Sequence, residues 1–134
     1  MKYYLYFSKQ YGSGKMTWYS DLIESNESTT AFVRKRFKNA KFEVVRQYER
    51  DDTIIRESRF VLDGKTLVTS TVVIPMDNPP GFLQLIHDKE ESIGDIIKEK
   101  GFRVERYVLS RDRSSKHYMI RGNVQMEVFE EYSE

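Results

Sequence analysis

Hydrophobic and polar residues alternate along several short stretches of the chain, which is the pattern of half-buried β-strands. The clearest stretch covers residues 54–64 and ends in Asp63-Gly64, a strong turn signal. Residues 65–75 form a second stretch directly after it, so the pair predicts a β-hairpin. One face of the first strand is predicted to carry Ile54, Arg56, Ser58, Phe60 and Leu62, and the other Ile55, Glu57, Arg59 and Val61.

Arg56 lies on the more apolar of these two faces, so its side chain is expected to point inward. A guanidinium held inside needs a carboxylate or phosphate, because an unpaired buried charge is costly. Three alternatives are open from the strand pattern alone. Arg56 pairs with an acid of the protein, anchors a small anionic ligand, or points outward because the face taken as apolar is the polar one.

The same alternation predicts further strands at residues 42–49, 102–110, 118–121 and 124–132. In the strand at 42–49, one face is expected to carry Phe42, Val44, Arg46 and Tyr48, and the other Glu43, Val45 and Gln47. Residues 2–8 predict a short strand or an extended arm. The final strand places Val124, Met126, Val128, Glu130 and Tyr132 on one face.

Helices are predicted where capping residues precede a helical repeat of apolar positions. Ser28 is a good N-cap for a helix over residues 29–38, and Ser92 begins a helix that ends at Gly101. Residues 18–24 and 82–87 are candidates for short helices. Together the elements predict one α+β domain over residues 1–134, with a single antiparallel β-sheet and two or three inserted helices.

Composition excludes several classes of function. Hydrophobic residues make up 39% and charged residues 32% of the chain, which fits a globular domain. There is no cysteine, which excludes thiol catalysis and cysteine zinc sites, and two histidines are too few for a multi-histidine metal site. We therefore expect no metal site of these kinds.

The formal net charge of +1 gives no general attraction to nucleic acid or to an acidic membrane surface. No apolar run is long enough for a signal peptide or a transmembrane helix. The expected protein is cytoplasmic, a monomer or homodimer, with a small-molecule anionic substrate as its partner and no nucleic acid or membrane partner.

Three further positions join Arg56 as candidates for an anion site. The helix starts at Thr29 and at Ile93-Gly94 present backbone N–H groups without helical partners, at the positive end of the helix dipole. Glu130 is a carboxylate on an apolar face, which indicates a partner or a site. The alternative for Glu130 is that the last strand frays into solvent near its end.

Five short motifs, in order, resemble the chorismate pyruvate-lyase family. The first is residues 21–30, similar to the family's stretch ending in Ser-Met-Thr before a helix, and the second is residues 42–46, similar to its next strand. The third consists of Ile55-Arg56-Glu57, Asp63-Gly64 and residues 71–75, similar to the family's Arg-Glu…Asp-Gly…Val-Val-Pro hairpin. The fourth is Ser92-Ile93-Gly94, similar to its Ser-Ile-Gly helix start, and the fifth consists of Arg113, Gly122 and Glu130-Glu131-Tyr132, similar to its closing Arg…Gly…Glu-x-Phe. Thr29 stands where the family usually has Met, and the chain is shorter than typical members.

The resemblance implies a chorismate lyase-like fold and a cofactor-free lyase that splits chorismate into 4-hydroxybenzoate and pyruvate. It implies that Arg56 binds a substrate or product carboxylate, which the backbone at Thr29 and at Ile93-Gly94 shares. It implies that Glu130 contacts the ring hydroxyl or the ether. The same scaffold also suits a cyclase for a biosynthetic intermediate, or a domain that binds a small molecule without turnover. A further alternative is an interaction protein whose polar residues are simply paired.

Overall fold

The computed structural model describes residues 17–134, which form an α+β fold with one six-stranded antiparallel sheet and four helices. The strands are β1 (Lys41–Arg50), β2 (Thr53–Leu62), β3 (Lys65–Pro75), β4 (Val104–Arg111), β5 (Ser115–Gly122) and β6 (Met126–Tyr132). The helices are α2 (Ser20–Glu24), α3 (Thr29–Arg36), α4 (Pro80–Asp88) and α5 (Ile93–Lys100). The expected strand or arm at residues 2–8 lies outside the described residues.

The expected fold class is confirmed at the level of α+β with a single antiparallel sheet, but the expected number of helices is wrong. Within residues 17–134 there are four, because both short apolar candidates are helical. The first is α2, which buries Leu22 and Ile23. The second is α4, which starts at a proline and buries Phe82 and Ile86. No helix of the described residues is both long and apolar enough to cross a membrane.

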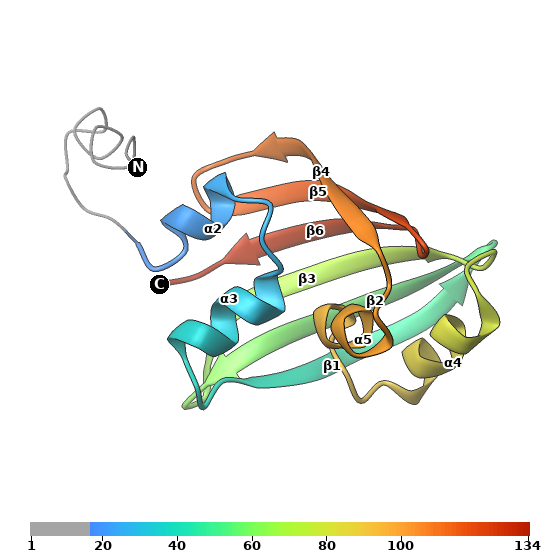
Figure 1. Ribbon diagram of the computed structural model, residues 1–134. Helices are drawn as coiled ribbons and strands as arrows, with labels where there is room; N and C mark the ends of the chain where they lie inside the picture. Colours follow the sequence, from blue (N-terminus) through green and yellow to red (C-terminus); the bar gives the residue numbers. More distant parts are fainter. Residues whose placement is uncertain (1–16) are drawn as a thin grey trace.

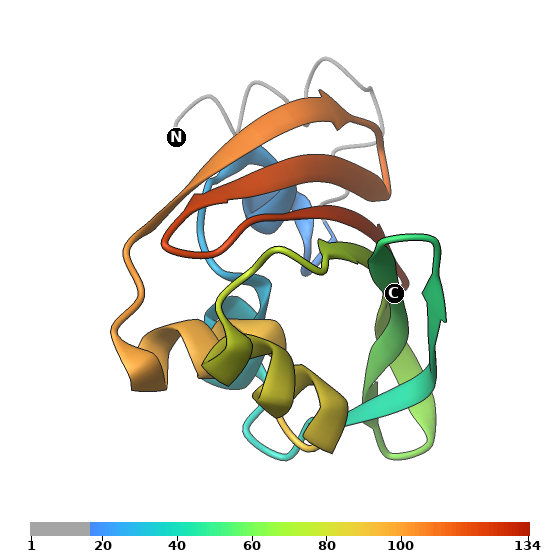
Figure 2. The ribbon, with the colours of Figure 1, turned by 90° about the vertical axis from the view of Figure 1, so that its right-hand side faces the viewer.

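The sheet consists of two three-stranded halves, with the strand order β1-β2-β3-β6-β5-β4. The halves join where β3 pairs with β6, for example Val72 opposite Val128. The sheet curls, and α3, α4 and α5 lie on its concave side (Figures 1 and 2). The start of α3 and the start of α5 therefore face the middle of the sheet, where the inward side chains of β2 and β6 lie.

The buried hydrophobic residues form two clusters. The first packs α4 and α5 against the centre of the sheet: Ile54, Val72, Ile74, Phe82, Ile86, Ile96, Ile97, Tyr118, Ile120, Val124, Met126 and Val128. The second packs α2 and α3 against the ends of β2, β3 and β6: Tyr19, Leu22, Ile23, Phe32, Val33, Phe60, Leu67, Val68 and Tyr132. Several buried side chains are polar: Thr29, Thr30, Arg56, Ser58, Asn78, Ser92, Lys116 and Glu130.

Strand β2 follows the predicted alternation, since Ile54, Arg56, Ser58 and Phe60 are all buried. Strand β1 does not, because its register shifts at a bulge between Val44 and Arg46. The bulge leaves Val45 exposed and brings Gln47 opposite Arg56. The predicted placement of Gln47 on the face opposite Phe42 and Val44 is therefore wrong, and the error concerns a residue that contacts Arg56.

Candidate functional site

A small cavity of about 40 Å³ lies between the concave face of the sheet and the starts of α3 and α5. Its walls include all five site residues predicted from the sequence: Thr29, Arg56, Ile93, Gly94 and Glu130. Members of both hydrophobic clusters complete the walls, among them Phe60 and Val72. A volume of this size has room for one or two water molecules or for one small chemical group.

Arg56 is completely buried, and its guanidinium is held by neutral acceptors. Its Nε donates to Gln47 Oε1, its Nη1 to the Glu91 carbonyl and its Nη2 to the Ile86 carbonyl, each at 2.9 Å. Burial lowers the pKa of Arg56 to about 10, so the side chain stays charged at neutral pH. Among residues 17–134, no carboxylate forms an ion pair with it.

The structure removes one of the alternatives left open by the strand pattern, the pairing of Arg56 with an acid of the described residues. Within the described residues Arg56 is not paired with an acid, and its N–H groups donate to the Gln47 side chain and to the carbonyls at the end of α4 and in the following loop. A guanidinium has five N–H donors, and three are used here. Arg56 therefore keeps its charge without an acidic partner among the described residues.

Glu130 is buried within β6 rather than frayed into solvent, with 4% of its surface exposed. Three hydroxyls hold its carboxylate. Thr29 Oγ1 and Tyr132 OH donate to Oε1 at 2.7 Å each, and Tyr118 OH donates to Oε2 at 2.9 Å. Burial and then the Glu130 charge raise the pKa of Tyr118 and that of Tyr132, so both remain protonated donors.

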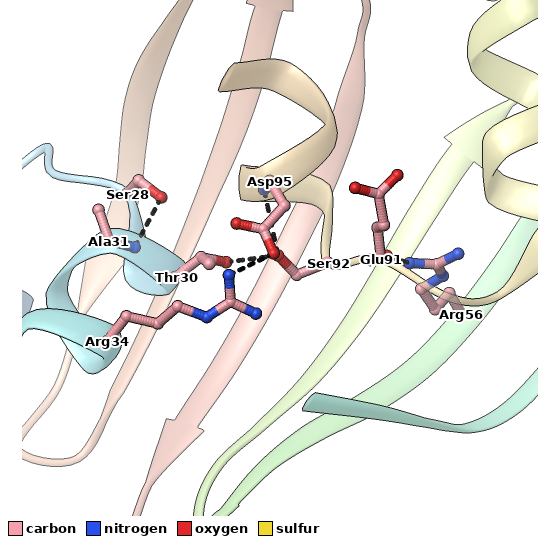
Figure 3. A network of polar contacts seen from close by, with 8 residues as sticks. All are labelled: Ser28, Thr30, Ala31, Arg34, Arg56, Glu91, Ser92 and Asp95. Carbon is pink, nitrogen blue, oxygen red and sulfur yellow. Dashed lines mark hydrogen bonds and ion pairs between the residues drawn. The ribbon is translucent and has the colours of Figure 1, made fainter. Parts of the chain in front are cut away.

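The starts of α3 and α5 are capped and linked to each other. Ser28 Oγ accepts from the Ala31 amide, and Ser92 Oγ accepts from the Asp95 amide. Thr30 Oγ1 donates to Ser92 Oγ at 2.9 Å, which joins the two helix starts (Figure 3). The Glu91 carbonyl bound by Arg56 directly precedes Ser92, so the Arg56 network reaches the start of α5.

Gly94 allows the two helices to approach this closely. A Cβ atom at this position would lie 2.7 Å from Thr30 Oγ1 and 2.8 Å from Ser28 Oγ. An ion pair between Arg34 and Asp95 adds a second link between α3 and α5 (Figure 3). The two helix starts therefore line the cavity as linked neighbours, and their predicted role in binding an anion stays a prediction.

Four residues that contact or line this site were missed from the sequence. Tyr118 and Tyr132 lie on inward faces that the alternation of β5 and β6 indicates, but their hydroxyls have no sequence signal of their own. Gln47 was assigned to the wrong face of β1, because the sequence does not show the bulge. Arg106 lines the cavity from β4, and it shares its face with Val104 and Val108, the same signal that singled out Arg56.

Together these features define a class: an α+β domain with a small cavity of mixed polar and apolar walls, which has a cation at one wall and a hydroxyl-bound carboxylate at another. Within residues 17–134, no three His, Asp or Glu side chains gather in a way that could hold a metal ion. No protein-family model matches the chain. No curated protein matches it either.

Proposed function

We propose that the protein is a cofactor-free lyase of the chorismate pyruvate-lyase type, acting on chorismate or a similar anionic enol ether. One observation carries the proposal. Arg56, a buried cation without an acidic partner in the described residues, and Glu130, a buried carboxylate, line the same cavity as the starts of α3 and α5. These are the positions at which the chain resembles that family.

The residues suit the chemistry that the resemblance implies. In the elimination, the carbon–oxygen bond to the enolpyruvyl group breaks, the ring loses a proton and becomes aromatic, and the released enol takes up a proton to become pyruvate. No oxidant or co-reactant is needed, so the protein mainly has to position the substrate and stabilise developing charge. Arg56 binds the ring carboxylate, and Glu130 accepts a hydrogen bond from the ring hydroxyl.

Thr29 fits this arrangement although the family usually has Met at its place. Its hydroxyl donates to Glu130 at 2.7 Å and so helps to fix the carboxylate. The cavity of about 40 Å³ is far below the roughly 300–1,000 Å³ of pockets that hold small molecules. Binding of chorismate therefore requires the cavity between the sheet and the starts of α3 and α5 to widen.

The test is incubation of the purified, folded protein with chorismate, followed by mass spectrometry. We expect chorismate to disappear faster than in buffer, with equal amounts of 4-hydroxybenzoate and pyruvate formed. The control is Glu43→Gln, which removes an exposed carboxylate on β1 and should leave turnover unchanged, whereas Glu130→Gln should reduce it. Chorismate loss equal to that in buffer contradicts the proposed activity.

A second candidate function is binding of an anionic metabolite smaller than chorismate without turnover, because the cavity of about 40 Å³ is small for chorismate. This function predicts saturable binding that stabilises the fold, with no product in the mass spectrum. The cyclase alternative requires a larger and more apolar pocket, and the charged cavity walls do not favour it.

A further inference from the structure

Arg106 is the one arginine of the described residues whose side chain has a buried nitrogen without a hydrogen-bond partner. The atom is Nε, and the residue lines the same cavity as Arg56 and Glu130. Buried polar side-chain atoms in folded proteins are nearly always hydrogen-bonded, so an unpaired donor in a cavity wall calls for an explanation. The ion pairs among residues 17–134 do not include Arg106.

Arg106 and Arg56 approach the cavity from different parts of the sheet. Arg56 is on β2 and Arg106 on β4, with β3, β6 and β5 between them in the strand order. On a flat sheet, four strand spacings separate positions by about 19 Å. Because the sheet curls, both side chains line one cavity, which they reach from opposite halves of the sheet.

Arg106 lies at the Glu130 end of the cavity. It is opposite Ile120 on β5, two residues from Tyr118, whose hydroxyl donates to Glu130. A second anionic group of a ligand at this end would be repelled by the Glu130 carboxylate unless a cation were beside it. Arg106 supplies that cation, and its free Nε–H supplies a directed donor.

We propose that Arg106 is a specificity-determining residue that binds a second carboxylate of the ligand, so that the site selects dianions over monoanions. The inference rests on the proposed function, since it assumes that Arg56 binds the first carboxylate. In chorismate the second carboxylate is that of the enolpyruvyl group. Arg106 then holds the leaving group next to Glu130, while the ring carboxylate stays on Arg56.

Two probes test this role: chorismate, whose affinity is taken from the KM of turnover or, without turnover, from calorimetric titration, and 4-hydroxybenzoate, which is titrated calorimetrically. Chorismate carries two carboxylates and 4-hydroxybenzoate carries one. We expect Arg106→Gln to weaken chorismate binding by about 10- to 100-fold, the scale of a hydrogen bond to a charged group, and to change 4-hydroxybenzoate binding less than about threefold. Arg106→Lys keeps the charge and should recover part of the chorismate affinity.

The matched control is Arg121→Gln, which removes the same charge from an exposed position on the neighbouring strand β5 and should change neither affinity. Equal weakening of both probes by Arg106→Gln, or no weakening of either, overturns the inference. Failure of the proposed activity gives a different result: wild-type protein then binds chorismate but releases no pyruvate. Wild-type protein that binds neither probe overturns both.

Discussion

Replacement of Tyr118 by Phe tests whether Glu130 is held as a charged, hydrogen-bonded group inside the fold. The change removes only the hydroxyl that donates to Glu130 Oε2 at 2.9 Å, and it keeps the ring that packs in the first hydrophobic cluster. Both side chains are almost completely buried, so water does not replace the lost donor. The hydroxyls of Thr29 and Tyr132 remain on Oε1.

The expected loss of stability follows from the charge of the acceptor. A hydrogen bond to a charged group contributes about 1.5–3 kcal/mol, and a neutral bond about 1 kcal/mol. We therefore expect Tyr118→Phe to lower the free energy of unfolding by about 2 kcal/mol. In the background of Glu130→Gln, where the acceptor is neutral, the same replacement should cost only about 1 kcal/mol.

Urea unfolding of the two single variants, the double variant and wild type measures both numbers as a double-mutant cycle. The matched control is Tyr107→Phe, because Tyr107 OH donates to the Glu105 carboxylate at 2.6 Å on the exposed side of β4. The control should leave the urea midpoint unchanged. The reasoning is refuted if Tyr118→Phe costs nothing, or if it costs the same whether residue 130 is Glu or Gln.

Two more predictions concern the helix starts and the buried lysine. Gly94→Ala should lower the free energy of unfolding by about 1–3 kcal/mol, because the added methyl group overpacks against Thr30. The control is Gly81→Ala in α4, where a Cβ meets nothing within 4 Å, and it should raise the free energy of unfolding by up to about 1 kcal/mol. Equal effects of the two variants in thermal unfolding would contradict the close packing of α3 and α5. Burial lowers the pKa of Lys116 to about 8, so from pH 8 to 10 the unfolded chain binds the proton that the folded protein has lost, and stability relative to Lys116→Met should rise. A difference between wild type and Lys116→Met that stays constant over this range in urea unfolding would contradict this prediction.

The sequence correctly predicted which side chains of β2 and β6 point inward and where two helices begin, because both depend on local patterns. The alternation in β2 and β6 placed Arg56 and Glu130 inside, and the capping serines placed the starts of α3 and α5. These features depend on neighbours within a few residues, which a sequence pattern reports directly. That the same residues line one cavity depends on the curl of the sheet, which no local pattern contains.

The errors have physical causes of the same kind. The bulge after Val44 adds one residue to β1 and so reverses the side on which Gln47 lies, and no turn residue marks it in the sequence. The hydroxyls of Thr29, Tyr118 and Tyr132 meet Glu130 only after α3, β5 and β6 have come together. Arg106 had the same sequence signal as Arg56. Its proposed role depends on an Nε atom that has no hydrogen-bond partner, and this is visible only in the structure.

The central claim is that Arg56 binds the carboxylate of an anionic ligand inside the cavity. The most direct measurement is the affinity of 4-hydroxybenzoate for wild type, Arg56→Lys and Arg59→Lys by calorimetry. Arg59 lies on the other face of β2, exposed and paired with Glu43, so its replacement should change nothing. We predict that Arg56→Lys, which loses the planar fork of donors, binds at least about tenfold more weakly than wild type. Equal affinities for Arg56→Lys and wild type, or no binding by wild type, would contradict the claim.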